Sequence, residues 1–90
     1  MAGFLLNLET VSKLSVAVQT SIGKRVFLFN RLHYSERKVY RVNVFGETRN
    51  RYFSMEYLDN EWVFVRPELV EPWMEEALDE LRDALNKHDQ

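Results

Sequence analysis

An alternating stretch decides the fold: KVYRVNVF, residues 38–45. Every second side chain from Tyr40 to Val44 is apolar, and Arg41 and Asn43 lie between them. Successive side chains of a strand point to opposite faces of its sheet, so this pattern gives one apolar face and one polar face. It predicts a strand that is buried on one side only, as in an antiparallel sheet.

The sequence on both sides of this stretch continues the sheet. Residues 51–57 alternate in the same way, with Phe53, Met55 and Tyr57 opposite Ser54 and Glu56. The segments between these stretches contain Gly, Asn and Asp, which tolerate left-handed backbone angles and are therefore common in turns. We expect strands at 25–32, 38–45, 51–57 and 62–65, joined by loops at 34–37 and 46–50 and a two-residue turn at 59–60. These make an antiparallel meander of about four strands.

An amphipathic helix follows Pro72. The apolar residues recur at three- and four-residue spacing, at Met74, Ala77, Leu78, Leu81, Ala84 and Leu85. Proline is tolerated in the first turn of a helix, and acidic residues gather at this helix start. We therefore expect a two-layer α+β domain in which this helix packs on the sheet.

Residues 7–22 fit two structures. Leu8, Val11, Leu14, Val18 and Ile22 fit a helix that begins after Asn7 and ends at Gly23. Residues 14, 16 and 18 also alternate, and the segment is rich in the β-branched residues that strands favour. We expect an N-terminal helix here and keep the strand as the alternative.

The length and composition of the chain limit the kinds of functional site that it can contain. The 90 residues allow one small domain, residues 1–90, and the chain has no cysteine. No zinc–thiolate site, iron–sulfur cluster or thiol nucleophile can therefore form. His33 and His88 have no orienting partner in their sequence context, and the three glycines lie too far apart for a phosphate-binding loop. We expect no enzyme activity, no metal and no cofactor.

The N-terminal sequence carries no targeting signal that we recognise. Its apolar residues Phe4, Leu5, Leu6 and Leu8 are interrupted by Asn7, and no basic residue precedes them. We expect a cytoplasmic protein that does not enter membranes.

Charge is segregated along the chain. Residues 24–51 contain eight basic and two acidic side chains, whereas residues 52–90 contain three basic and eleven acidic ones. The net charge of −2 therefore conceals a basic part of the sheet and an acidic helix.

Two kinds of binding module follow from this distribution. The first is a protein-contact module, which acts through the acidic helix with Trp73 as an exposed anchor or through an open sheet face. The alternative for Trp73 is that it packs with Trp62 where the sheet meets the helix, which would make it a core residue. A homodimer that joins sheet to sheet is one form of it.

The second kind binds single-stranded nucleic acid. Arginines and aromatic rings on one sheet face suit phosphates and unstacked bases. We expect the binding residues Arg25, Phe27, Phe29, Arg31, Arg41 and Tyr52 on that face. The alternative is that a helix covers the same face, which would make Phe27 and Phe29 core residues.

The expected order of elements, a meander of strands closed by one helix, is similar to that of Pur-repeat and Whirly-type single-strand binders. With residues 7–22 helical it is similar to the double-stranded-RNA-binding domain. That domain has lysines at the start of its second helix, where this chain has Glu71, Glu75 and Glu76. No residue motif of the chain carries either resemblance, so no family is assigned.

Overall fold

The computed structural model describes residues 13–88. Its elements are the strands β1 (Lys13–Thr20), β2 (Gly23–His33), β3 (Lys38–Phe45), β4 (Asn50–Leu58) and β5 (Glu61–Phe64), the 3-10 helix η1 (Pro67–Leu69), and the helices α2 (Pro72–Glu75) and α3 (Leu78–His88). The strands form a five-stranded antiparallel sheet in the order β1-β2-β3-β4-β5, so each strand pairs only with its neighbours in the chain. The α+β class and the antiparallel meander are confirmed.

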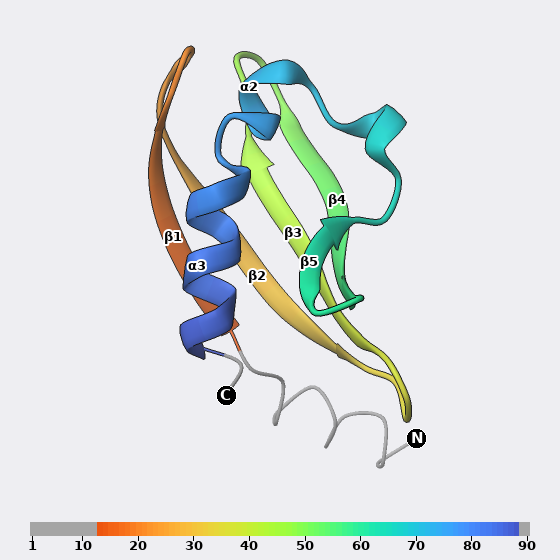
Figure 1. Ribbon diagram of the computed structural model, residues 1–90. Coiled ribbons are helices and arrows are strands. Elements are labelled where there is room, and N and C mark those ends of the chain that lie inside the picture. Colours follow the sequence, from red (N-terminus) through yellow and green to blue (C-terminus); the bar gives the residue numbers. More distant parts are fainter. Residues whose placement is uncertain (1–12, 89–90) are drawn as a thin grey trace.

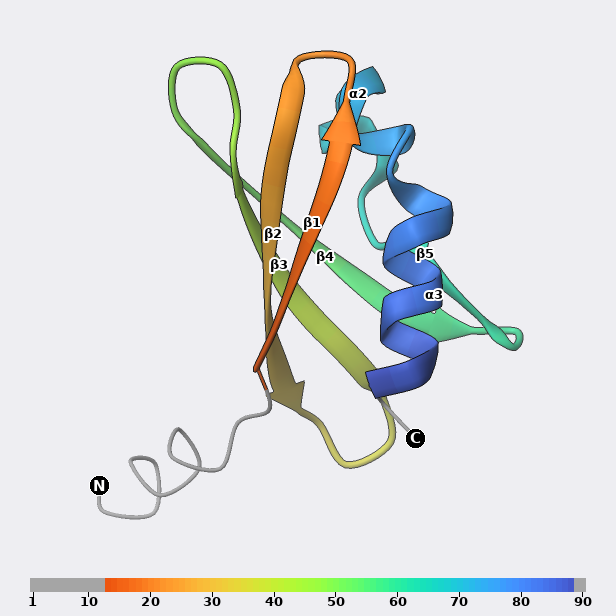
Figure 2. The ribbon, with the colours of Figure 1, turned by 90° about the vertical axis from the view of Figure 1, so that its left-hand side faces the viewer.

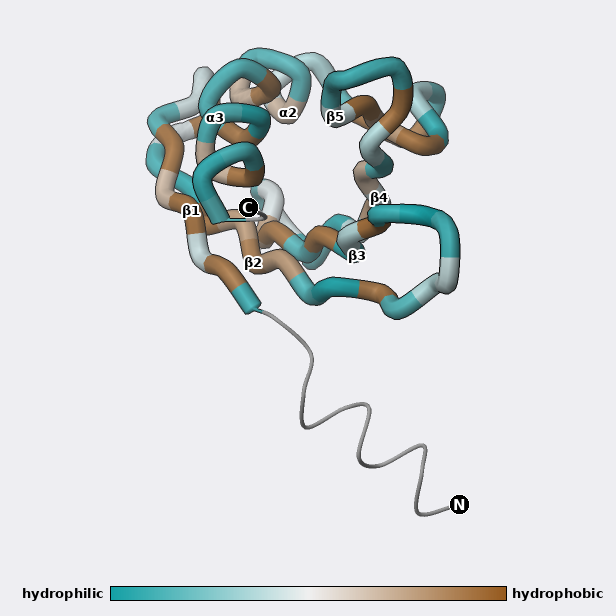
Figure 3. The backbone as a smooth tube through the Cα atoms, turned by 60° about the horizontal axis from the view of Figure 1, so that its bottom comes forward, coloured by the Kyte–Doolittle hydropathy of each residue, from teal (hydrophilic) through white to brown (hydrophobic). Residues whose placement is uncertain are grey.

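The sheet twists and curls into a half-barrel, and α3 lies inside the curve (Figures 1 and 2). Seen from one end, the strands form an arc and the helices stand between its two ends (Figure 3). Helix α3 contacts both edge strands, β1 and β5. The sheet therefore has a concave inner face that α3 covers and a convex outer face.

The expected helix over residues 7–22 is wrong for residues 13–20, which form strand β1, and residues 7–12 lie outside the described residues. Leu14 and Val16 pair with Phe29 and Phe27 of β2, so the period-two pattern prevails over the helical one. The physical reason is that β2 needs a partner for its backbone groups on this side. The sheet thus has one strand more than the sequence predicted.

The expected turn residues do take left-handed angles. Asp59 and Asn60 have φ values of 51° and 68° and form the β4–β5 turn, as predicted. Gly23 has a φ of 105°, but it closes the β1–β2 hairpin and not a helix. In that hairpin the Thr20 hydroxyl donates to the Gly23 carbonyl over 2.6 Å and accepts from the Ile22 N–H over 3.2 Å.

The core lies between the inner face and the helices. Aromatic rings line the inner face and meet edge to face: Tyr40 lies 5.5 Å from Trp62 and 6.0 Å from Phe29 between ring centroids. Leu81 and Leu85 of α3 pack on this layer and are fully buried. Edge-to-face pairs of this kind stabilise a core beyond the area that they bury.

The predicted C-terminal helix is present and is divided into α2 and α3. The chain turns between them, where the Ala77 N–H donates to the Met74 carbonyl over 3.0 Å. Arg82 fixes α3 to the far edge of the sheet, because its Nε donates to the Trp62 carbonyl over 2.7 Å. The helix is thereby attached to β5 as well as packed on the core.

Leu81→Ala tests the packing of α3. We expect a loss of about 2–5 kcal/mol in the free energy of unfolding, because the truncation leaves a cavity at a fully buried position. Val26→Ala on the outer face is the control and should change it by about 0.5 kcal/mol at most. Urea denaturation measures both. A loss below about 1 kcal/mol for Leu81→Ala would contradict the described core.

Candidate functional site: the outer face of the sheet

The outer face carries a group of half-exposed large apolar side chains. No helix of the described residues packs on this face (Figure 2). Val26 and Leu28 of β2, Phe45 of β3 and Tyr52 of β4 expose 50%, 43%, 52% and 56% of their surfaces. We call these four residues the outer patch.

The register of the sheet makes the outer patch contiguous. Leu28 pairs with Asn43, and Asn43 pairs with Tyr52, so these three side chains form a row across β2, β3 and β4. Phe45 follows two residues after Asn43 on the same face of β3, and Val26 precedes Leu28 on β2 in the same way. Diagonal neighbours on one sheet face lie about 7–8 Å apart, within reach of large side chains.

A polar atom sits in the middle of this apolar group. The Asn43 Oδ1 atom is buried, and no donor from the described residues reaches it. A buried amide oxygen gains from any donor that arrives with a partner.

Basic side chains without ion pairs surround the outer patch. Lys13, Lys24 and Arg41 point to the outer face, and Arg49 lies in the β3–β4 loop. None of the four makes an ion pair or side-chain hydrogen bond in the described part of the chain. They give this face a positive field that can steer an anionic partner.

The strands β1–β4 contain one carboxylate, Glu56, and it is already engaged. Arg37 Nε and Nη2 donate to its two oxygens over 2.8 and 3.0 Å. This hydrogen-bonded pair, reinforced by the Arg37 charge and opposed by burial, holds the pKa of the Glu56 carboxyl below its ordinary value. The negative charge on this face is therefore neutralised locally.

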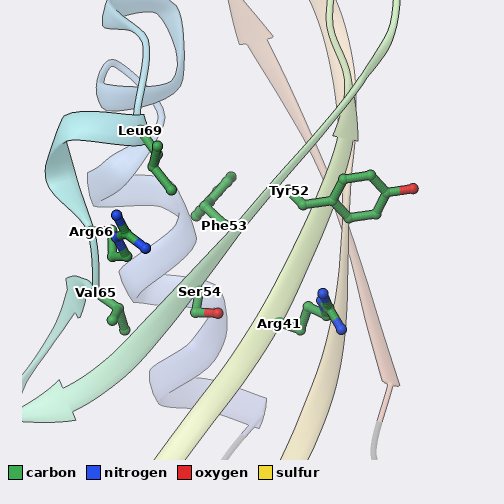
Figure 4. A pocket seen from close by; sticks show the side chains of 7 residues that line it. All are labelled: Arg41, Tyr52, Phe53, Ser54, Val65, Arg66 and Leu69. Carbon is green, nitrogen blue, oxygen red and sulfur yellow. The ribbon is translucent and has the colours of Figure 1, made fainter.

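A groove opens beside the outer patch, where β5 leaves β4 (Figure 4). The Val65 N–H donates to the Ser54 carbonyl over 2.9 Å, and the chain then turns away into η1. Figure 4 shows Arg41 and Tyr52 on one side of Ser54 and the residues that follow β5 on the other. The residues that line the groove are Arg41, Tyr52, Phe53, Ser54, Val65, Arg66 and Leu69.

The groove combines cationic, hydroxyl and aromatic groups. Arg66 pairs with Glu68 over 3.0 Å, but both side chains are more than three-fifths exposed, and such a surface pair holds its partners only weakly. Arg41 and Arg66 thus line the groove on opposite sides of Ser54.

The structure separates the predicted binding residues into two groups. Arg41 and Tyr52 lie together on the outer face, as expected. The placement of Phe27 and Phe29 on that face is wrong: they lie on the inner face, 0% and 1% exposed. The α3 layer covers these rings, so they belong to the core.

Arg25 and Arg31 also leave the expected face. They pair with the inner-face residues Val18 and Tyr40, so their side chains start from the concave side at the two ends of β2. Arg25 Nη2 donates to the Ile22 carbonyl over 2.9 Å, and the Arg31 guanidinium lies 5.4 Å from the Tyr40 ring centroid. Neither side chain therefore lies with Arg41 on the outer face.

Trp73 is not an exposed anchor. It is 7% exposed, its ring lies 6.3 Å from that of Phe27, and its Nε1 donates to Glu71 Oε1 over 2.6 Å. Glu71 also pairs with Arg51. The ring is therefore part of the core at the α2 end of the sheet, and the expectation that it is exposed is wrong.

Three residues of the outer patch were not predicted: Val26, Leu28 and Phe45. A signal was present, because VFLF at residues 26–29 is a continuous apolar run, and such runs are typical of strands with both faces covered. In this fold Phe27 and Phe29 of the run are buried on the inner face, whereas Val26 and Leu28 are exposed on the outer face.

Neither metal chemistry nor a membrane span is indicated within residues 13–88. No three His, Asp or Glu side chains there lie close enough together to hold a metal ion. No helix in that range is long and apolar enough to cross a bilayer.

No protein-family model, curated protein or solved structure matches this chain.

Arg37→Gln tests the electrostatics of this face. We expect the pKa of Glu56 to rise toward its ordinary value, because the hydrogen bonds and the charge that lower it are removed. Since the folded-state pKa lies below the unfolded one, the pair stabilises the fold above the unfolded pKa. That contribution is lost as the pH falls through the lowered pKa. NMR titration of the Glu56 carboxyl carbon measures the shift.

The matched control is Arg66→Gln, which removes the other carboxylate-paired arginine near this face. It should leave the titration of Glu56 unchanged, because Arg66 pairs with Glu68. An unchanged Glu56 pKa in Arg37→Gln would contradict the described pair.

Proposed function

We propose that this chain is a small non-enzymatic binding module that contacts a protein partner through its outer sheet face. The observation that carries the proposal is the outer patch, Val26, Leu28, Phe45 and Tyr52, which is contiguous and about half exposed. Exposed apolar groups of this kind, rimmed by polar residues, are typical of interaction surfaces.

The rim defines the partner's chemistry. Lys13, Lys24, Arg41 and Arg49 surround the outer patch without ion pairs in the described residues, so a partner with carboxylates around an apolar centre is complementary. A donor from the partner would satisfy the Asn43 amide oxygen. We therefore propose an acidic, apolar protein surface as the occupant.

A regulatory or scaffolding role fits better than catalysis. His33 is exposed at the end of β2, and the His88 ring lies 6.4 Å from the Tyr40 ring centroid, away from the groove. Neither faces Arg41 or Ser54 across a shared pocket. The cytoplasmic location expected from the N-terminal sequence belongs to the same proposal.

Single-stranded nucleic acid is the second candidate, and the surroundings of Tyr52 favour it. Asn43, its pairing partner, has Arg41 and Phe45 as its neighbours on the outer face of β3. A cation and a second ring therefore flank the Tyr52 ring diagonally. Bases can stack on exposed rings while arginine meets the phosphates.

Site-specific photocrosslinking tests the protein contact. A benzoylphenylalanine in place of Leu28 should give a discrete, nuclease-resistant protein adduct in cells, and one in place of Asn86 on α3 should not. The crosslinked peptide should be rich in Asp, Glu and apolar residues. Phe45→Asp should remove the adduct, because it places a carboxylate where an acidic surface docks.

The proposal is wrong if position 28 gives no more adduct than position 86, or if Phe45→Asp leaves the adduct intact. An adduct that nuclease destroys would support the second candidate in its place.

Fluorescence anisotropy with labelled single-stranded RNA and DNA tests that second candidate. Tyr52→Ala should weaken binding about 5- to 150-fold, the equivalent of about 1–3 kcal/mol for one stacked base. Arg41→Gln should reduce the slope of log affinity against log salt by about 0.7, the value for one phosphate contact. Lys87→Gln on α3 is the control and should change neither. Absence of binding at low salt would exclude this candidate.

A further inference from the structure

Strand β1 is one edge strand of the sheet, and α3, which covers the inner face, contacts it. It pairs with β2 in unbroken register from Lys13 to Thr20 and stands at the end of the strand order. No described residue hydrogen-bonds to the free side of its backbone between Lys13 and Val18. Within its eight residues this edge has no proline, no bulge and one charge, so it lacks the protections against pairing that an edge strand carries in its own sequence.

The opposite edge is protected. Strand β5 has four residues, the Arg82 Nε donates to its Trp62 carbonyl, and the helix η1 begins at Pro67, shortly after the strand ends at Phe64. Short edge strands and nearby proline are devices that prevent further pairing. The two edges of the sheet therefore differ, and only β1 is suited to accept a strand.

The sequence of β1 is complementary to itself. About Val16 the side chains match in kind: Leu14 with Val18, Ser15 with Ala17, and Lys13 with Gln19. An antiparallel copy centred on Val16 would therefore place apolar beside apolar on the inner face and small beside small on the outer face.

The inner face of β1 is also incompletely covered. Val18 is 1% exposed, but Leu14 and Val16 are only partly buried at the margin of the core. A second β1 strand would bring its own Leu14 and Val18 beside them and remove more apolar surface from water.

We propose that two copies of this chain associate through their β1 strands, antiparallel about a two-fold axis at Val16, into one continuous ten-stranded sheet. The pairing is isologous, so it closes at two copies, and the protected β5 edges stop further growth. It also sets the two outer faces side by side on one surface. The inference stands independently of what the outer face binds.

Single cysteines test the register, because the natural chain has none. Directly opposed residues of antiparallel strands lie about 4.5–5.5 Å apart between Cα atoms, which permits a disulfide. Under mild oxidation of the full chain, Val16→Cys should give a covalent dimer. The matched control, Val63→Cys at the protected β5 edge, should stay monomeric.

Charge exchange gives a second test on exposed positions of the outer face. A chain with both Ser15→Lys and Ala17→Lys should be monomeric by sedimentation equilibrium, because like charges oppose each other across the axis. A chain with both Ser15→Glu and Ala17→Glu should also be monomeric, for the same reason. An equimolar mixture should restore the dimer, and thermal midpoints confirm that each variant is folded.

Three outcomes would overturn the inference. One is a wild-type chain that remains monomeric at the highest attainable concentration. Another is a dimer that withstands the lysine pair but is lost in Leu28→Asp, which would place the interface on the outer patch. The third is equal oxidation of Val16→Cys and Val63→Cys.

Discussion

The packing of α3 into the curve of the sheet is the constraint on which the rest of the structure depends. Leu81 and Leu85 seal the inner face, and Arg82 ties the helix to β5. Because α3 contacts both edge strands, it holds the half-barrel at its curvature. The chain has no second helical layer in its described part, so the outer face is left to solvent or to partners.

The charged side chains are also divided between the α3 side of the molecule and the outer face of the sheet. The acidic side chains gather on α3 and its surroundings, and the cations without ion pairs gather on the outer face and its rim. A nearly neutral chain thus has two faces of opposite character. Such a field contributes little to the fold, but it selects the direction from which a charged partner approaches.

The sequence predicted the strands from β2 to β5, the Asp59–Asn60 turn and the C-terminal helix, because period-two and helical patterns report burial on one face directly. It misassigned residues 13–20, where both patterns fit and only pairing with β2 decides between them. Arg41 and Tyr52 were placed correctly from local alternation. Phe27, Phe29 and Trp73 were not, since the face that α3 covers is a tertiary property that local pattern does not encode.

The strand order has a consequence for synthesis at the ribosome. Every hairpin joins strands adjacent in the chain, so each can form as soon as its two strands have emerged. Helix α3 follows all five strands in the chain, and until it emerges the inner-face rings of Phe27, Phe29 and Tyr40 have no cover from it. The nascent chain therefore passes through a stage with a bare aromatic surface, when chaperone binding or aggregation would compete with completion of the fold.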